Sequence, residues 1–460
     1  MVTVLGANTL SSGGFEVANS CRFDGSSSSM SITPGSNMNL DRWTWSGWIK
    51  RSSIGVLQSI LAADNAASDT TLIEFDANDK LNFLNLVSNN IKGKKITDRV
   101  FRDISAWYHI VVVWDSANST AADRIKIYVN GVRETSFATS DNPDSGVDSS
   151  LGESGVATLI GTYVGEDSRF FNGYLAEVVL IDGSALAPTS FGEFDEDSGI
   201  WKPIKVSGLT FGTHGFYLDF QASGNLGNDA NGGTDLGESG LAATDQSTDT
   251  CTNNFATFNP LVKPAAAIPL SEGNLKGVFP GSWTALPATF GLTKGKWYFE
   301  AKNITSGQNA FIGVVTENQK WDDGTPYNET TGVVLFGPGG RKTVDNTSND
   351  GFFATLSSGQ IVGVALNLDS STKTIQFSVN GTDTPNSTPV DLPSTFDDVF
   401  IFPYFIGNSS SETSNWELNF GSPPYSESGG NSDGDGFGNF KTAPPSGHFA
   451  LCTKNLAEYG

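Results

Sequence analysis

Two short segments, far apart in the chain, restrict what this sequence can fold into. Residues 125–132 read IKIYVNGV and residues 375–382 read IQFSVNGT. In each, apolar and polar side chains alternate with a period of two, the pattern of a β-strand with one buried face. Each strand then stops at Asn-Gly, which supplies the positive φ angles of a tight type I′ hairpin turn. We therefore predict two antiparallel β-domains of the same general kind, which favours binding surfaces over most catalytic folds.

Length and composition indicate the same class. At 460 residues the chain can form two or three domains, each with a core of its own. It contains 52 Gly, 31 Phe and 10 Trp, and long helical periodicities are missing, as is typical of β-sandwiches with many tight turns. The near-continuous apolar run at 107–115 predicts a strand buried on both faces. We predict an all-β protein of two antiparallel sandwiches joined by a Gly/Asn-rich linker.

Changes in composition divide the chain into five segments. Two long stretches alternate strands with turns, and the segments around them are rich in small polar residues. The middle one is either a linker or a chain draped over the first sandwich. We predict a polar arm at 1–20, a first sandwich at 21–220, a bridging segment at 221–269, a second sandwich at 270–425 and a Gly/Ser/Pro-rich segment at 426–460.

The charge and the cysteines restrict partners and compartment. A formal net charge of −23 with only 27 Lys and Arg argues against nucleic acid, because phosphate contacts need clustered cations. The N-terminus has neither the basic nor the apolar region of a signal peptide, and no run approaches the roughly 18 apolar residues of a membrane span. We therefore expect synthesis in the cytoplasm without membrane insertion. Cys21, Cys251 and Cys452 lie far apart without metal spacing, so we expect free thiols.

Motif order adds a resemblance for each half. The first half carries, in order, CRFDGSSSS, TWSGWIKR, WYHIVVVWD, IKIYVNGV and FNGYLAEVVLIDG. This order resembles the laminin-G-like branch of the concanavalin A-like lectin/glucanase superfamily, whose jelly-roll sandwich it implies. The second half carries GKWYFEAK, FIGVV, GQIVGVALNLDSSTKTIQFSVNG and WELNFGSPPY. That order resembles SPRY-type domains, which are two-sheet sandwiches of concanavalin-like topology.

The whole arrangement, including the bridge TDQSTDTCTNNFATFNP and the close SGHFALCTKNLAEYG, resembles structural proteins of tailed bacteriophages, particularly marine ones. The resemblance implies a virion component: a fibre, a spike or a capsid-surface protein. We expect other virion proteins or sister chains as partners, and a homo-oligomer.

One carboxylate pattern invites comparison with glucanases. The glucanase relatives of the fold carry Glu-x-Asp-x-x-Glu on one strand, as nucleophile and general acid. Here Glu74 and Asp76 are followed by Asp79, which is shorter and falls in an Ala-Asn-Asp turn. We interpret the three as hairpin residues and predict no enzymatic activity. The histidines are too scattered for a metal cluster: His109, which we expect to be packed in a core strand, His214 and His448.

Calcium is the one cofactor that the sequence suggests. Five residues occupy positions one, three, five, six and nine of an EF-hand-type loop: Asn431, Asp433, Asp435, Gly436 and Asn439. The twelfth position is Thr442 instead of a bidentate Glu, and no flanking helices are apparent. Two interpretations stay open, a calcium site and a flexible Gly-Asp surface loop.

The loop 319–332 carries the side chains expected of a sugar site. Aromatic rings stack on the C–H face of a pyranose, while carboxylates and amides bind its hydroxyls. The loop offers Trp321, Asp322, Asp323, Tyr327 and Asn328. The SPRY resemblance implies a partner-binding loop at this place. The alternative is that Trp321 is a buried anchor of the loop.

These observations lead to one main hypothesis and two alternatives. The main hypothesis is a non-enzymatic bacteriophage virion surface protein, a fibre, spike or appendage, that recognises a host-surface glycan or protein through many weak contacts multiplied by copy number. The first alternative is a capsid decoration without a receptor role. The second is a glycan-degrading enzyme of the glucanase fold.

Overall fold

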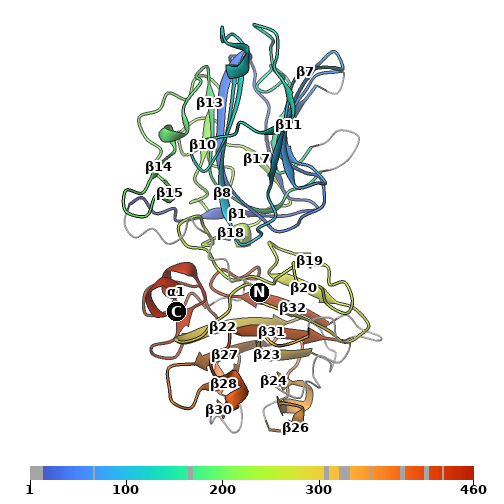
Figure 1. The fold of residues 1–460 in the computed structure, drawn as a ribbon, viewed down its shortest axis with the longest axis vertical. Helices are drawn as coiled ribbons and strands as arrows, with labels where there is room; N and C mark the ends of the chain where they lie inside the picture. Colours follow the sequence, from blue (N-terminus) through green and yellow to red (C-terminus); the bar gives the residue numbers. More distant parts are fainter. Residues whose placement is uncertain are drawn as a thin grey trace. The chain divides into compact units, whose positions relative to one another are not determined.

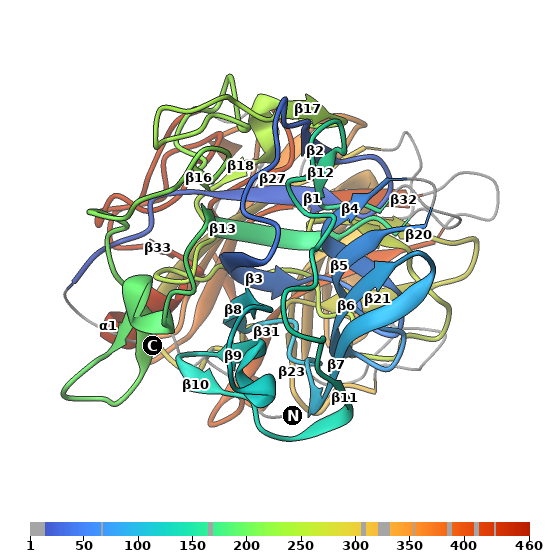
Figure 2. The same ribbon diagram turned by 90° about the horizontal axis from the view of Figure 1, so that it is seen from above.

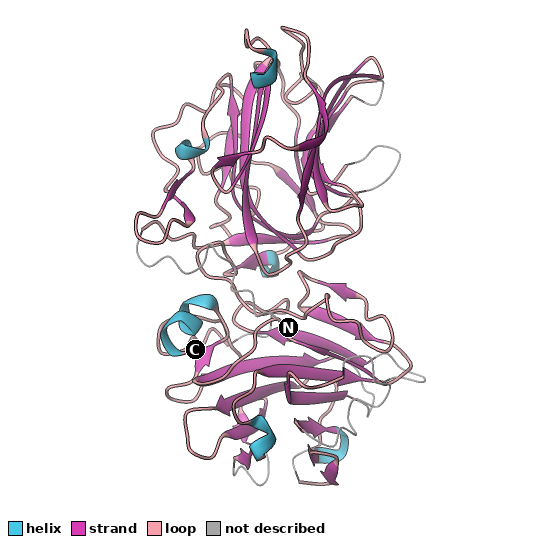
Figure 3. Cartoon of the chain, in the orientation of Figure 1, coloured by secondary structure: helices cyan, strands magenta, loops and turns pink. Residues whose placement is uncertain are grey.

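The computed structural model describes residues 14–65, 68–163, 169–304, 310–320, 332–352, 355–383, 389–408, 414–426 and 429–460. The contacts of the chain separate it between Thr252 and Asn253 into two compact units (Figure 1). We call these the first unit and the second unit and describe each by itself. Both consist of strands and loops, with very little helix (Figure 3).

The first unit is a sandwich of two eight-stranded antiparallel sheets. One sheet has the order β10-β9-β8-β3-β13-β1-β18, with β16 added beside β13, and β3 lies between β8 and β13 (Figure 2). Its strands are β1 (Ser20–Asp24), β3 (Arg42–Arg51), β8 (Trp107–Asp115), β9 (Ile125–Val129), β10 (Val132–Arg133), β13 (Asn172–Asp182), β16 (Phe216–Leu218) and β18 (Gln246–Ser247).

The other sheet of the first unit has the order β11-β7-β6-β5-β4-β12-β2-β17. Its strands are β2 (Ser29–Ile32), β4 (Gln58–Asp64), β5 (Thr70–Phe75), β6 (Lys80–Val87), β7 (Asn90–Val100), β11 (Phe137–Asp141), β12 (Thr158–Ile160) and β17 (Gly237–Ser239). A separate two-stranded ribbon is formed by β14 (Gly192–Phe194) and β15 (Trp201–Pro203).

In the first unit, alternate residues of each long strand pack on opposite faces of the sheet. Along β3, Trp43 and Trp45 lie in the core between the sheets, whereas Trp48 packs on the opposite face. Along β8, Ile110 joins the core between the sheets and Val111 packs under the segment that follows β13. The prediction of a strand buried on both faces is therefore confirmed for β8.

The second unit is also a sandwich. Its larger sheet has the order β19-β20-β32-β22-β27-β28-β29, with β30 beside β28 and β33 parallel to β22, and its smaller sheet has the order β21-β31-β23-β24-β25-β26. The larger sheet contains β19 (Leu270–Ser271), β20 (Lys276–Phe279), β22 (Lys296–Asn303), β27 (Ile361–Asn367), β28 (Thr374–Val379), β29 (Thr382–Asp383), β30 (Val390–Asp391), β32 (Ser414–Asn419) and β33 (Phe449–Ala450). The smaller sheet contains β21 (Thr284–Pro287), β23 (Ala310–Thr316), β24 (Val333–Gly337), β25 (Arg341–Val344), β26 (Thr347–Asn349) and β31 (Ile401–Gly407).

Both Asn-Gly turns have the predicted backbone. The φ angles are 48° and 77° at Asn130 and Gly131, and 50° and 76° at Asn380 and Gly381. Positive φ at both central residues defines the type I′ turn, whose twist matches that of the paired strands. The all-β class with two antiparallel sandwiches is thus confirmed.

The small-polar segments are anchored by a few large apolar side chains. In the segment 221–269, Leu226 and Leu236 are buried in the first unit, and Phe258 is buried in the second. The segment 426–460 adds Phe440 and Leu451 to apolar clusters of the second unit. It ends in α1 (Thr453–Tyr459), and none of the described helices is long and apolar enough to cross a membrane.

Candidate functional site

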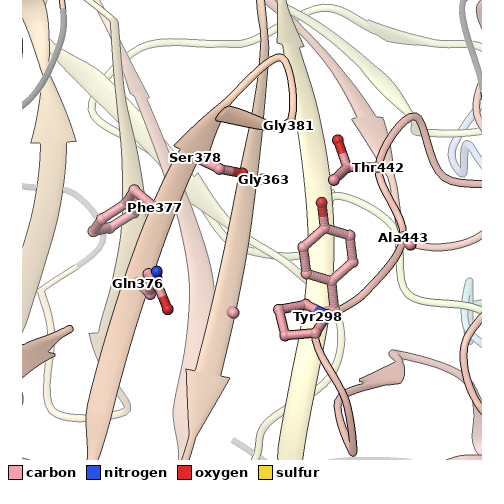
Figure 4. Close-up of a pocket in the computed structure, with 10 residues that line it drawn as sticks. Tyr298, Gly363, Gln376, Phe377, Ser378, Gly381, Thr442 and Ala443 are labelled. Atoms are coloured by element: carbon pink, nitrogen blue, oxygen red, sulfur yellow. The ribbon is translucent and has the colours of Figure 1, made fainter. Parts of the chain in front are cut away.

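A hollow of about 280 Å³ opens on the outer face of the larger sheet of the second unit, where the C-terminal segment lies beside β22, β27 and β28 (Figure 4). Strands β22, β27 and β28 supply its floor and the turn after β28 closes one end. The lining residues are Tyr298, Gly363, Ala365, Gln376, Phe377, Ser378, Gly381, Thr442, Ala443 and Pro445.

Strand alternation explains why these residues face the hollow. Tyr298, Ala365 and Gln376 are in register across β22, β27 and β28 and therefore share one face of the sheet. Phe377 points the other way into the core (Figure 4), so its contribution to the lining is from the backbone. A Cβ atom on Gly363 would lie 2.5 Å from the Tyr298 hydroxyl and 2.6 Å from Ser378 Oγ. The glycine thus gives the hollow its depth.

A buried carboxylate holds the C-terminal wall in place. Glu300 has no exposed surface, and its Oε1 accepts hydrogen bonds from the Tyr298 hydroxyl at 3.0 Å and from the Thr442 backbone N–H at 2.9 Å. Its Oε2 accepts from the Lys441 N–H at 2.8 Å and from Asn419 Nδ2 at 3.1 Å. The two backbone N–H donors, from Lys441 and Thr442, fix the start of the segment 441–445 against β22.

Burial sets the protonation of the groups beneath the hollow. It raises the pKa of the Tyr298 hydroxyl, and the neighbouring Glu300 carboxyl raises it further. Burial likewise raises the pKa of Glu300, against the opposing effect of its hydrogen-bond donors. Tyr298 therefore stays a neutral phenol at physiological pH.

The chemistry of the hollow is uncharged and polar. None of its lining residues carries a charge; three carry hydroxyls and Gln376 carries an amide, while alanine and proline supply apolar contact. Such a surface can bind a ligand by hydrogen bonds, and it has no charged group with which to move a proton. Sequence reasoning missed this site, although the alternation of Tyr298 and Glu300 onto one face of GKWYFEAKN was a usable signal.

The sugar-site prediction made for the loop 319–332 concerns Trp321, Asp322, Asp323, Tyr327 and Asn328. All five lie outside the described residues.

The structure gives each member of the glucanase-like triplet its own partners. Glu74 forms an ion pair with Arg169 at 2.7 Å. Asp76 accepts two backbone N–H groups of the turn, at 2.8 and 2.9 Å. Asp79, with φ of 65°, accepts the Gly55 N–H at 2.7 Å and pairs with Arg51 at 3.1 Å. The triplet thus organises the β5–β6 turn and its surroundings.

The EF-hand-like loop directs its oxygens toward donors of the protein. Asp433 is buried; its Oδ1 accepts the N–H groups of Asp435 and Phe437, and its Oδ2 accepts Ala450 N–H and Asn455 Nδ2 at 2.9 and 2.8 Å. The other predicted ligands also have partners in the protein: the Tyr459 hydroxyl donates to Asp435, Asn431 Nδ2 donates to the Phe440 and Lys441 carbonyls, and the Gly430 N–H donates to Asn439 Oδ1. Within the described residues no three His, Cys, Asp or Glu are gathered to hold a metal ion. Calcium binding stays a prediction.

His109 is a packed, neutral histidine. Trp201 Nε1 donates to its Nδ1 at 3.0 Å, so Nε2 carries the proton and donates to Ser46 Oγ at 2.9 Å. Burial lowers the pKa of His109 to about 3. The three cysteines are buried free thiols, as predicted.

Comparison with known proteins places the first unit in a fold class. Residues 24–189 match the family described as the concanavalin A-like lectin/glucanases superfamily, in its laminin-G form. This confirms the laminin-G-like resemblance over that range, and such a domain fits a carbohydrate- or protein-binding role. No curated protein matches the chain.

Solved structures give distant likenesses. One is the SPRY domain of human HERC1, with 14% identity and a TM-score of 0.28, covering 35% of this chain and 96% of that one. Another is a heptameric SAP-like pentraxin from Limulus polyphemus, with 16% identity and a TM-score of 0.29, covering 38% of this chain and 80% of that one. A third is the LG1-3 region of the laminin alpha2 chain, with 9% identity and a TM-score of 0.34, covering 88% of this chain and 62% of that one.

Proposed function

We propose that the chain is a non-enzymatic surface protein of a bacteriophage virion, a fibre, spike or appendage, that recognises a glycan or protein on the host cell. It is made in the host cytoplasm and mounted on the particle as a homo-oligomer beside other virion proteins. The order of its motifs, from the laminin-G-like half to the SGHFALCTKNLAEYG close, supports the virion assignment.

The observation that carries the binding role is the uncharged hollow above Tyr298. Its hydrogen-bonding groups stand on a β-sheet and on the segment beside it. The buried Glu300 carboxylate holds Tyr298 and the backbone of Thr442 in place. The affinity of one such small site for its ligand is expected to be weak. Repeated over many copies on one particle, avidity can exceed the single-site affinity by roughly 10²–10⁴-fold.

The test has two parts. Mass spectrometry of purified particles from a host that carries the gene should find the chain as a virion component. The purified protein, added in excess, should then compete with those particles for adsorption to the host. Absence from particles overturns the virion assignment, whereas presence without competition supports the capsid-decoration alternative.

The glucanase alternative has its own test. If the purified protein cleaves a host polysaccharide and Glu74→Gln abolishes cleavage while leaving the melting temperature unchanged, the non-enzymatic proposal is wrong. The sequence-based loop hypothesis is tested by Trp321→Ala with Tyr327→Ala, which should weaken competition if that loop contributes to recognition.

A further inference from the structure

We infer that the hollow above Tyr298 binds one uncharged, hydroxyl-rich ring: a neutral sugar residue and not an acidic one. This inference rests on the proposed function and deepens it by naming the ligand class. Its basis is the size of the hollow, its hydrogen-bonding groups, the absence of cations from its lining and the carboxyl group beside Tyr298.

Size restricts the ligand to a single ring. Ligand pockets usually span roughly 300–1,000 Å³, and this hollow, at about 280 Å³, lies at the lower limit. Gly363 keeps the floor deep, since a Cβ there would meet both the Tyr298 and the Ser378 hydroxyls. An extended chain can therefore place one unit in the hollow while its neighbours stay outside.

The polar groups of the hollow complement hydroxyls. The hydroxyls of Ser378 and Thr442 donate to Tyr298 and keep lone pairs that can accept from a ligand, and Gln376 carries an amide. The hydroxyl of Tyr298 donates to Glu300 and accepts hydrogen bonds from the side chains of Ser378 and Thr442. A sugar hydroxyl, which is both donor and acceptor, can donate to the Ser378 and Thr442 oxygens and can pair with an amide. Ala365, Ala443 and Pro445 supply apolar contact for the C–H edges of a ring.

Charge excludes acidic sugars. The hollow has no lysine, arginine or histidine in its lining, so a ligand carboxylate would lose water without gaining a cation. The carboxyl group of Glu300 lies beside Tyr298, within 3.0 Å of its hydroxyl, and any negative charge on it repels an anion in the hollow. Nearby Lys441 contributes its backbone N–H to Glu300, and its side chain does not line the hollow.

The experiment uses the full chain and a panel of free monosaccharides, each neutral sugar paired with its uronic acid, observed by saturation-transfer NMR and titration. At least one neutral sugar should bind, and its acid counterpart should bind at least tenfold more weakly. Ala443 is exposed on the rim, so Ala443→Phe should block the hollow without disturbing the core and should reduce affinity at least tenfold. The matched control is Ser446→Phe, exposed in the same segment and outside the lining, which should leave affinity unchanged.

The outcomes separate this inference from the proposed function. If no neutral sugar binds, if the acids bind equally well, or if Ala443→Phe binds like the parent, the inference is wrong. If the purified protein still competes with particles for adsorption to the host in such a case, the proposed function remains supported. Sugar binding that Ala443→Phe removes supports the inference, whether or not competition is lost as well.

Discussion

The Tyr217 hydroxyl donates a 2.6 Å hydrogen bond to Glu177, a buried carboxyl group in the middle of β13. Glu177 lies in a bulge between Ala176 and Val179 and has a φ of 50°, which is rare for a residue other than glycine. Burial raises the pKa of Glu177 to about 7, although the bond from Tyr217 works in the opposite direction.

This pair predicts a pH dependence of stability. Because the folded pKa of Glu177 lies above its unfolded value of about 4.5, stability is greatest below pH 4.5 and falls as the pH rises toward 7. Glu177→Gln keeps an acceptor for Tyr217 and carries no charge. Its free energy of unfolding, measured with urea from pH 4 to 9, should exceed that of the parent by up to roughly 3 kcal/mol above pH 7 and match it near pH 4. The exposed Glu196→Gln is the control and should give no such difference.

The bulge also shows where sequence reasoning reaches its limit. In a regular strand, Leu175 and Val179 would share one face, as the alternation of NGYLAEVVLID implies. They lie instead on opposite faces, because the extra residue at Glu177 shifts the register. Regular strands and Asn-Gly turns were predictable because their signals are local.

The hollow could not be predicted for a different reason. It depends on Glu300 meeting the backbone of Thr442, and no local pattern connects residues so distant in the sequence. The segment that contains Thr442 is rich in Gly, Ser and Pro, which indicates a loop but not where that loop packs.

Removing the charge of Glu300 should loosen the wall of the hollow. In Glu300→Gln the amide nitrogen replaces one acceptor, so a backbone N–H of Lys441 or Thr442 would face a donor. We expect a loss of roughly 1–3 kcal/mol in the free energy of unfolding. Limited proteolysis should cut the C-terminal segment faster than in the parent. The exposed Glu458→Gln should change neither measurement.

The buried ion pair of Lys50 and Asp249 should contribute more to stability than the hydrogen bonds to Glu300. Lys50 and Asp249 lie 2.7 Å apart with side chains only 2% and 3% exposed, and Trp107 Nε1 donates to the other Asp249 oxygen. Lys50→Met leaves the Asp249 carboxylate buried without its cation, which should cost roughly 3–5 kcal/mol. Chemical denaturation should show this loss, and Lys50→Met with Asp249→Leu should recover part of it.

An exposed pair is the matched comparison for that experiment. Arg341 and Asp350 are 37% and 72% exposed, so solvent screens their attraction. Arg341→Met should lower the free energy of unfolding by no more than about 1 kcal/mol. Equal losses in Lys50→Met and Arg341→Met would contradict the assignment of the energetic difference to burial.

The Asn-Gly turn after β9 provides the last prediction. Gly131 has a φ of 77°, and a Cβ there would overlap the indole of Trp201, so the position needs glycine for two reasons. Gly155 has a similar φ of 80° and nothing within 4 Å of its Cβ position. Gly155→Ala should therefore cost only the backbone strain of roughly 1–2 kcal/mol, whereas Gly131→Ala must also displace Trp201 and with it the hydrogen bond to His109. Thermal unfolding of the two variants should show the larger loss for Gly131→Ala, and tryptophan fluorescence should change in that variant alone. Equal melting temperatures would mean that Trp201 moves at no cost and that only the turn conformation selects glycine.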